Sequence, residues 1–486
     1  GEIPAESRRY STADLLATES HALHTAIDRQ DEGLAAVPSH TVEAVLADGA
    51  LSVDQGVAVR RLLTSGAGVE VVVGPAGSGK TAALRAAHAA WKASGVEVCG
   101  VAVAAIAART LQAGTGIQSQ SLARLARAIR GDGPGEGLPP AGGVLVVDEA
   151  GMVGTRDLAW LTEATRVARV KLVAIGDPAQ LPEIDAGGLF DAWTRALPHA
   201  RLSGNLRQRE DWERDALAVL RDGDVQVALN AYDGAGRLHL HDDAPAARAA
   251  LITDYLNARQ NGGEVVMLTS RRSDAQVLNT MARQALGDAG GLDGPSLTVT
   301  VSGRPVEWRN GDEALITRND YRHGLINGTR GRVTHVGADG VTVATDTGPL
   351  QVPRQVLDAG VLAYGYALTC HKAQGITVDI ALLYASSPLT RESGYVGMSR
   401  GRSANHLYGS LDALLPEVDA ELDHPSDDSV AASERTELMR AALVARLEVR
   451  GRQRLALADA DPAARERVER WMAAGRDTAR RVGRSR

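Results

Sequence analysis

The pattern of apolar and polar positions predicts a parallel α/β domain over residues 51–200. Short apolar runs in this part of the chain alternate with stretches of helical character. The runs lie near residues 69–73, 96–103, 144–147 and 171–175. Strands that alternate with helices are typical of a parallel sheet with helices on its faces.

The same alternation of apolar runs and helical stretches predicts a second α/β unit over 201–299 and 354–410. It includes an apolar run at 264–269. Between its two parts, residues 300–353 contain short β-rich runs at 333–336, 340–344 and 350–352, separated by Gly, Asp and Asn. Such spacing predicts a small antiparallel barrel inserted into the second unit.

Both ends of the chain differ from these units. Residues 1–50 are polar and predicted helical, with a helix start at 11–14. Residues 411–432 are acidic and contain two prolines, as in a linker. Residues 433–486 are Ala- and Arg-rich and predicted helical; the basic end is either a solvated helix or a surface for DNA or a partner.

The segment from Gly74 to Thr81 reads G-P-A-G-S-G-K-T, a complete phosphate-binding P-loop. It follows an apolar run and precedes an Ala-rich helical stretch, which is the context that the motif needs. Gly74, Gly77 and Gly79 let backbone N–H groups surround phosphates. Lys80 is predicted to reach the β- and γ-phosphates, and the Thr81 hydroxyl to hold Mg²⁺.

Bulk composition limits the kind of partner. The net charge is −7, so a nucleic-acid surface must be local, and aromatic residues make up only 3% of the chain. We therefore expect contacts to the DNA backbone rather than a path built on base stacking.

The sequence also favours a cytoplasmic protein without membrane insertion. Its two cysteines have neither disulfide nor metal-site spacing, and no run of about 18 apolar residues occurs. The start at Gly1 rather than Met suggests a fragment of a longer protein.

Polar residues follow two later strands. Asp148 and Glu149 end the run at 144–147; Asp148 is the candidate Mg²⁺ ligand and Glu149 the candidate general base. Alone, such a pair is as often two surface acids, but its distance from the P-loop favours the catalytic reading. Gln180 follows the run at 171–175 and can hydrogen-bond a γ-phosphate or the attacking water, unless its segment is only a proline-bounded turn.

Two arginines are candidates to stabilise the charge on a transferring phosphoryl group. They are Arg207 and Arg400, both in the second α/β unit. Each, taken by itself, is more often a surface arginine.

Taken in order, these segments resemble a superfamily 1 helicase of the RecD-like (1B) branch, and within it the helicase region of conjugative relaxases of the TrwC/TraA (MobF) type. The resemblance covers residues 51–407. The matching motifs are Q (51–55), I (74–81), II (148–152), III (176–182), IV (205–208), V (366–375) and VI (395–402). Residues 9–12 and 19–21 are similar to the segment that joins relaxase to helicase in that group.

The resemblance implies two RecA-like domains with ATP in the cleft between them, and an SH3-like character for the inserted barrel. It implies that Gln55 reads adenine and that Arg207 and Arg400 are arginine fingers. In motif V, Gln374 and Gly375 would lie near the nucleotide, and Thr369, His371 and Lys372 near single-stranded DNA. His371 in isolation is more often a core histidine.

Two departures from this family concern DNA. Motif Ia usually carries Pro-Thr, and residues 103–109 have neither. The Gly/Pro-rich loop at 131–143, where the branch places its strand-separating pin, has no aromatic residue. The duplex wedge is therefore either weak or supplied from elsewhere.

The segment His239-Leu240-His241 matches the H-hydrophobic-H pattern of relaxase nickases. It lies between motifs IV and V, and its alternation places both histidines on one face of a strand. No third ligand at a suitable spacing is evident, so nicking chemistry is not expected here.

Three functions stay open from the sequence. The first is an ATP-driven 5′→3′ DNA helicase or translocase, the motor of a conjugative relaxase, with the coupling protein and relaxosome as candidate partners. The second is a free-standing RecD-like repair helicase. The third is an ATP-switched DNA-binding scaffold of the transfer complex that does not unwind.

Overall fold

A computed structural model of the chain describes residues 11–47, 49–133, 135–183, 185–414, 432–451 and 455–459. The chain divides into two compact units. Unit 1 comprises Gly1–Gly204 and Arg452–Arg486, and unit 2 comprises Asn205–Gly451. Each unit has its own sheet and its own core, and each is described by itself.

Unit 1 is built on a six-stranded parallel sheet with the strand order β3-β2-β4-β5-β1-β6. The strands are β1 (Val69–Val73), β2 (Val98–Ala102), β3 (Gln118–Ser121), β4 (Val144–Val147), β5 (Lys171–Gly176) and β6 (His199–Arg201). The four strands expected from apolar runs are present. Their near-continuous apolar sequences fit strands that are covered on both faces.

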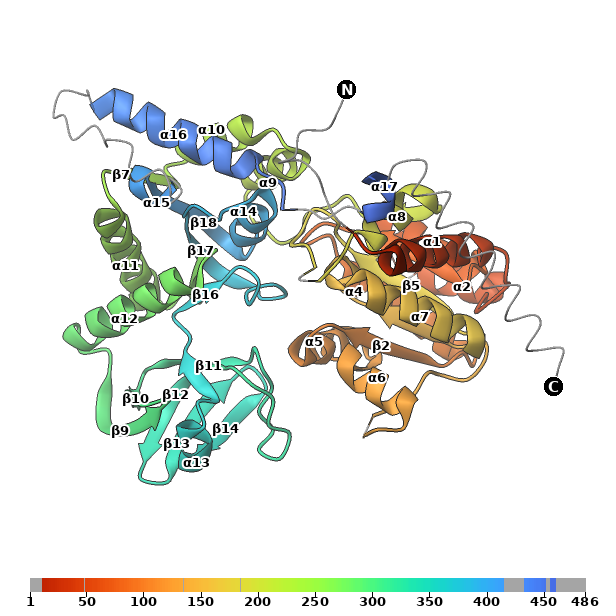
Figure 1. Cartoon of the computed structure of the whole chain (residues 1–486), viewed down its shortest axis with the longest axis horizontal. Helices are drawn as coiled ribbons and strands as arrows, with labels where there is room; N and C mark the ends of the chain where they lie inside the picture. Colours follow the sequence, from red (N-terminus) through yellow and green to blue (C-terminus); the bar gives the residue numbers. More distant parts are fainter. Residues whose placement is uncertain are drawn as a thin grey trace. The chain divides into compact units, whose positions relative to one another are not determined.

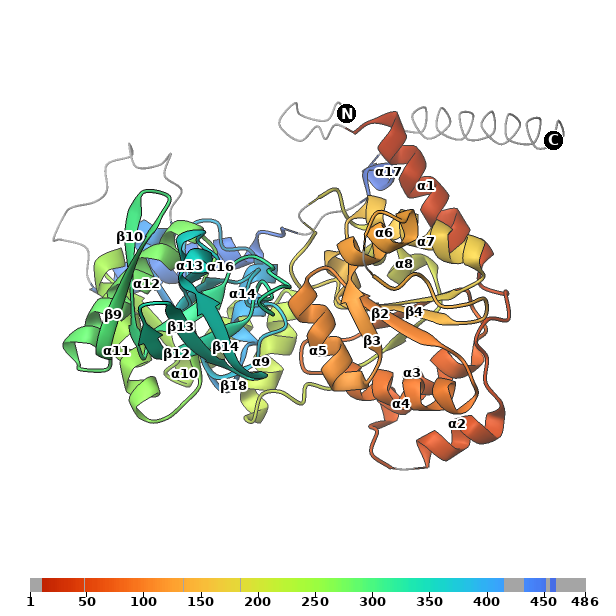
Figure 2. The same cartoon turned by 90° about the horizontal axis from the view of Figure 1, so that it is seen from below.

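Helices cover both faces of this sheet. One face carries α1 (Ala13–Asp28), α6 (Leu122–Arg130), α7 (Thr155–Ala168) and α8 (Leu189–Ala196). The other face carries α2 (Ser39–Leu46), α3 (Val53–Thr64), α4 (Lys80–Ala93) and α5 (Ala105–Thr115). Figure 2 shows the two helix layers on opposite sides of the strands.

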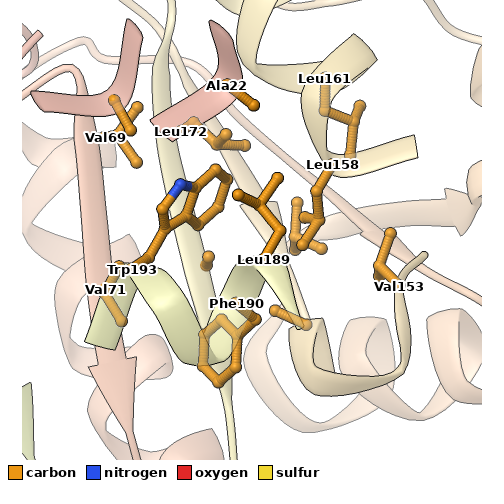
Figure 3. Packing of buried hydrophobic residues seen from close by; sticks show 14 of the residues in the cluster. Ala22, Val69, Val71, Val153, Leu158, Leu161, Leu172, Leu189, Phe190 and Trp193 are labelled. Atoms are coloured by element: carbon orange, nitrogen blue, oxygen red, sulfur yellow. The ribbon is translucent and has the colours of Figure 1, made fainter. Parts of the chain in front are cut away.

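The core of unit 1 is centred on α8. Trp193 is fully buried and lies against Val69 and Val71 of β1 and beside Leu189, while Leu158 and Leu161 of α7 close the same cluster (Figure 3). The cluster includes Ala22 of α1, so the N-terminal segment predicted as separate is packed into unit 1.

The first helix begins where the sequence predicts. Thr12 caps α1, because its hydroxyl accepts a hydrogen bond from Leu15 N. Arg29, at the end of the helix, is buried and donates to the Thr162 and Val170 carbonyls and to Thr165 Oγ1. These bonds fix α1 on α7.

Lys171, at the start of β5, is fully buried and its ammonium donates to Leu62 O (3.0 Å) and Ser65 Oγ (3.1 Å). Burial lowers the pKa of Lys171 to about 8, although the Glu70 carboxylate opposes this shift. Between about pH 8 and 10.5 the unfolded chain therefore binds more protons than the folded one, and the stability of unit 1 rises with pH.

We predict that Lys171→Met removes this pH dependence. Relative to the variant, the wild type should gain up to about 3 kcal/mol of unfolding free energy between pH 7.5 and 10.5, as the pKa shift requires. Urea unfolding of both proteins at several pH values measures the difference. Parallel pH profiles for the two proteins would contradict the prediction.

Unit 2 has a five-stranded parallel sheet with the order β16-β8-β17-β18-β7. Its strands are β7 (Leu238–His241), β8 (Val265–Thr269), β16 (Ala367–Thr369), β17 (Val378–Tyr384) and β18 (Gly401–Ser410). The helices α11 (Ala244–Gln260) and α12 (Arg272–Asp288) cover one face and share its core. The remaining helices next to this sheet are α9 (Asp211–Asp222), α10 (Val225–Gly234), α14 (Arg391–Met398), α15 (Leu411–Leu414) and α16 (Ala432–Glu448).

An antiparallel β insertion lies between β8 and β16. A five-stranded sheet has the order β14-β13-β12-β11-β15, and a two-stranded ribbon pairs β9 with β10. The strands are β9 (Asp293–Val301), β10 (Arg304–Asn310), β11 (Glu313–Ile316), β12 (Arg330–Gly337), β13 (Gly340–Thr345), β14 (Gly348–Pro353) and β15 (Leu362–Tyr364), with α13 (Arg354–Asp358) before β15. Figure 1 shows the insertion at one end of the unit 2 sheet.

The insertion is wider than the predicted 300–353. It begins at Asp293 and ends at Tyr364, because β9 and β15 share one buried core with β11–β14. Its antiparallel β character agrees with the prediction, and its SH3-like character stays a prediction.

After unit 2 the chain returns to unit 1. Leu455 is buried in the core around α8, and the carboxylate of Glu19 in α1 accepts hydrogen bonds from Ala456 N (3.1 Å) and Leu457 N (2.7 Å) at the start of α17 (Ala456–Asp459).

The predicted acidic linker at 411–432 starts with a helix, α15, instead of a coil, and residues 415–431 lie outside the described ranges. The predicted helical tail is represented by α16 and α17, and its basic end at 465–486 is also outside them. Within the described ranges, no helix combines the length and apolarity needed to cross a membrane.

Candidate functional site

The P-loop connects β1 to α4 at the carboxyl edge of the unit 1 sheet. Gly77 and Gly79 have φ values of +79° and +80°, a left-handed conformation that favours glycine. A Cβ on Gly74 would lie 2.6 Å from Ser78 Oγ and 2.9 Å from Lys80 Cγ, so this glycine is required by close contact. The sequence forms a tight loop here because its glycines satisfy both conditions.

Several polar groups of the loop are available to an anion. Within the described ranges, no hydrogen bond engages the backbone N–H groups of Gly77, Gly79 or Lys80. The buried Ser78 hydroxyl likewise has no partner in that part of the chain. Free N–H groups at the start of α4 form an anion-binding site, and this arrangement fits phosphate groups.

Lys80 and the acidic pair after β4 are close enough to influence each other. Lys80 Nζ donates to Gly74 O (2.8 Å) and Pro75 O (3.1 Å). Enclosure by protein and the neighbouring Glu149 raise the pKa of Asp148 to about 7, and the charge of Lys80 opposes this rise. A bound cation would favour the ionised form of this carboxyl group, which burial disfavours. Asp148 therefore suits a site for a divalent ion.

Glu149 has a left-handed backbone conformation, with φ of +50°. Non-glycine residues rarely adopt it, and such strain is often found at functional sites. The residue lies between β4 and the short 3-10 helix η2 (Ala150–Met152), with its N–H bonded to Asp148 Oδ1 (2.9 Å).

Gln55 is tied to the P-loop. Its side chain donates to Ser78 O (3.1 Å) and accepts from Ser52 N (3.1 Å), which completes the capping box of α3. The sequence did not reveal this link between the Q motif and the P-loop. In unit 1, Thr81 is exposed on the first turn of α4 and Gln180 is buried after β5.

In unit 2, the structure brings Arg207 and Arg400 to one residue, Ser399. Arg207 Nη1 donates to Ser399 O (2.8 Å), and Arg400 Nη2 donates to Ser399 Oγ (2.8 Å). Arg400 is buried and also donates to Val396 O (2.8 Å) and Ile376 O (3.4 Å). Motifs IV and VI therefore meet here, beside Ile376, the residue that directly follows motif V.

The predicted DNA-contacting residues lie where β16 ends. Thr369 closes the strand, and His371 and Lys372 are exposed in the turn that follows. Gln374 and Gly375 come next, and Gly375 has a φ of +82°. The turn is anchored by Cys370 N, which donates to Thr269 O of β8 (2.9 Å).

His239 of β7 packs against aromatic side chains of β18. His239 Nε2 lies 3.0 Å from His406 Nδ1, and its ring stacks on Tyr408 with centroids 4.5 Å apart. Burial lowers the pKa of His239, so the neutral form is favoured. Across the described ranges, no three His, Cys, Asp or Glu side chains are grouped as a metal site requires, and the absence of nicking chemistry stays a prediction.

Comparison with known proteins gives one family match and several similar proteins. Residues 50–243 match the family model described as an AAA domain. The conjugal transfer protein TraA of Rhizobium radiobacter is 33% identical over 412 residues, covering 84% of this chain and 36% of TraA. The ATP-dependent RecD2 DNA helicase of Deinococcus radiodurans is 30% identical over 356 residues, covering 71% of this chain and 47% of RecD2.

The fold comparison agrees with the sequence comparison. The crystal structure of the Pif1 helicase from Candida albicans aligns with a TM-score of 0.50 at 18% identity, over 74% of this chain and 94% of that one. Its likeness concerns the fold of two parallel-sheet units, which is RecA-like. The chain is therefore similar to TraA and to DNA helicases named RecD2 and Pif1. It spans only about a third of the length of the TraA proteins that it matches.

The structure adds one residue that the resemblance to superfamily 1B helicases did not supply. Arg272 is exposed on the first turn of α12, directly after β8, and β8 pairs with β16. Burial and the charge of Arg272 lower the pKa of both His371 and Lys372, so the three side chains form one basic group. The sequence contains only a weak indication of Arg272, namely a pair of arginines just after the carboxyl end of a parallel strand.

Proposed function

We propose that this chain is an ATP-driven motor that moves 5′→3′ on single-stranded DNA and separates duplex DNA ahead of it. The observation that carries the proposal is the P-loop of unit 1, with unbonded N–H groups and with Lys80 and Glu149 both within electrostatic range of Asp148. This arrangement suits the binding and hydrolysis of a nucleoside triphosphate.

Each residue near the P-loop has a role in this proposal. Lys80 and the loop N–H groups bind the phosphates, Thr81 and Asp148 hold Mg²⁺, and Gln55 reads adenine while it fixes the loop through Ser78. Bound Mg²⁺ would neutralise charge on the phosphate oxygens. Glu149 accepts a proton from the attacking water. Gln180 forms a hydrogen bond with the γ-phosphate or with that water.

Unit 2 supplies the remaining roles. Arg207 and Arg400, both bonded to Ser399, stabilise the transferring phosphoryl group, with Gln374 and Gly375 beside the nucleotide. Thr369, His371, Lys372 and Arg272 bind the DNA backbone. A motif V turn that touches both ligands converts ATP binding and hydrolysis into movement along DNA.

The relatives favour DNA transfer as the biological setting. TraA, described as a conjugal transfer protein, aligns over more of this chain than RecD2 does. We infer that the chain is the motor region of a conjugative relaxase, acting in the cytoplasm with the coupling protein and other relaxosome proteins.

ATP hydrolysis with and without single-stranded DNA tests the proposal. We expect strong stimulation by DNA, and at least about a 100-fold lower stimulated rate for Glu149→Gln, the lower end of what a general base contributes. Glu97→Gln, an exposed acid in the same unit, is the matched control and should hydrolyse ATP like the wild type.

A forked duplex with a 5′ tail then tests unwinding and polarity, against the same fork with a 3′ tail. Hydrolysis that is indifferent to DNA would argue against a motor and favour the ATP-switched scaffold. Stimulated hydrolysis without strand separation on either fork would limit the function to translocation.

A further inference from the structure

The proposed motor needs a contact that distinguishes single-stranded from duplex DNA, and one exposed aromatic side chain is suited to it. Tyr321 is 55% exposed, and no other aromatic side chain in the described ranges is comparably exposed. An aromatic ring in water forgoes favourable burial, so a lone exposed tyrosine in a chain with few aromatics calls for an explanation.

Tyr321 lies at the tip of an ordered hairpin, residues 317–329, that connects β11 to β12. Asp320 and Leu325 exchange both backbone hydrogen bonds (2.8 and 2.9 Å). Leu325 is fully buried in the core of the insertion and anchors the turn. Asn319 Oδ1 accepts from Asn327 N (2.8 Å) and ties the two arms together.

The carboxylate of Asp320 forms hydrogen bonds within the turn itself. The Asp320 carboxylate accepts hydrogen bonds from Arg322 N (3.1 Å) and His323 Nδ1 (2.7 Å). Asp320 is the sole acid between residues 317 and 329, and its carboxylate is engaged by these hydrogen bonds inside the turn. The phenol of Tyr321 is therefore presented by a rigid turn.

Basic residues flank Tyr321 in the sequence of the hairpin. Arg318, Arg322 and His323 are exposed next to it, and the Arg322 guanidinium has no hydrogen bond or ion pair with any described residue. Arg318 donates to Ala359 O, which orients its side chain. Aromatic rings flanked by arginine are the usual platform for unpaired bases, whose phosphates the arginine binds.

The surroundings argue against a protein partner. The exposed neighbours of Tyr321 within the hairpin are Arg, Asn, His and Gly, without a second apolar side chain. A protein interface requires an apolar centre larger than one ring. A stacked base requires only one flat aromatic face and a cation.

The hairpin is also connected to the motif V turn by strand pairing, a short stretch of chain and one hydrogen bond. Its sheet includes β15, which pairs with β11, and only two residues separate the end of β15 from the start of β16. Arg330, at the end of the hairpin, donates to Gly365 O in that connection (3.2 Å).

We propose that Tyr321 stacks on a base of single-stranded DNA while Arg322 binds an adjacent phosphate. The inference rests on the proposed function and adds a base-contacting site in the insertion. It adds one stacked base to the expected grip on the DNA backbone.

Binding of two fluorescent oligonucleotides tests the site: an oligothymidylate and a strand of equal length whose central residues are abasic. Tyr321→Ala should bind oligothymidylate about tenfold more weakly, within the range for loss of one stacked base. The same variant should bind the abasic strand like the wild type. Tyr321→Phe should keep wild-type affinity, because the ring remains.

Arg322→Ala should weaken binding of both strands and lower the salt dependence of affinity by about one phosphate contact. Val227→Ala, which removes another exposed apolar side chain of unit 2, is the matched control and should change nothing. If wild-type protein binds DNA and Tyr321→Ala binds oligothymidylate equally well, the stacking site is overturned. If the wild type binds neither strand, the proposed function itself fails.

Discussion

Replacement of Arg400 by alanine is expected to lower the kcat of ATP hydrolysis by roughly 10³- to 10⁵-fold, the contribution of an arginine finger. The guanidinium is buried and donates hydrogen bonds to Val396, Ile376 and Ser399. Because these hydrogen bonds already hold the guanidinium in place, its side chain needs no further ordering when the transition state forms. Its positive charge is therefore in position from the start. Single-turnover and steady-state hydrolysis measure the loss.

Arg402 provides the matched control, because it is two residues away and pairs with Asp379 and Glu264 at the surface. Arg402→Ala should keep its ATPase rate. Arg207→Ala should lower kcat as well, and the double variant should lose less than the product of the two effects, since both arginines bind Ser399.

A structural role for Arg400 would give another pattern. Arg400→Ala would then lose nucleotide affinity and thermal stability together with kcat, and Arg400→Lys would restore all three. For an arginine finger, nucleotide affinity and melting temperature stay close to the wild type while kcat falls, and lysine does not restore the rate.

Trp193→Ala should destabilise unit 1 by about 3–5 kcal/mol, the usual loss for a large aromatic removed from a core. Trp193 is fully buried between β1 and the helices of the same face, so few neighbours can move in to fill the space (Figure 3). Calorimetry of the full chain should show the transition of unit 1 at a lower temperature and that of unit 2 unchanged.

Two further variants make this result specific. Trp193→Phe should lose much less, because most of the ring volume remains and the indole N–H, which has no partner in the described ranges, is removed. Trp160→Ala, on α7 and only partly buried, should also lose less. Equal destabilisation by Trp193→Ala and Trp160→Ala would show that burial does not determine the cost.

The parallel sheets were predictable because their strands are buried on both faces and their sequences are continuously apolar. The run of β5 is an example: its residues are all buried. In contrast, β3 reads Gln-Ser-Gln-Ser and lies at the edge of its sheet, so tertiary pairing rather than its own sequence makes it a strand. The ribbon of β9 and β10 was missed for a related reason, because most of β9 is exposed.

The candidate site was predictable where one motif contains the whole geometry. The P-loop is such a case, because its glycines determine both the turn and the close contacts. The meeting of Arg207 and Arg400 at Ser399 was not, because it depends on how β18 and the chain before α9 come together. Arg272 and Tyr321 were missed because each depends on which residues surround it in space.

Residues 455–459 complete unit 1 only after all of unit 2 has been synthesised. A ribosome that adds about 5–20 residues per second needs roughly 10–50 s to pass from residue 204 to residue 455. During that interval the place of Leu455 in the apolar cluster is unfilled and the Glu19 carboxylate has not received its two N–H donors. The nascent unit 1 therefore exposes apolar surface while unit 2 emerges, and it reaches its final stability only after residues 455–459 have been added.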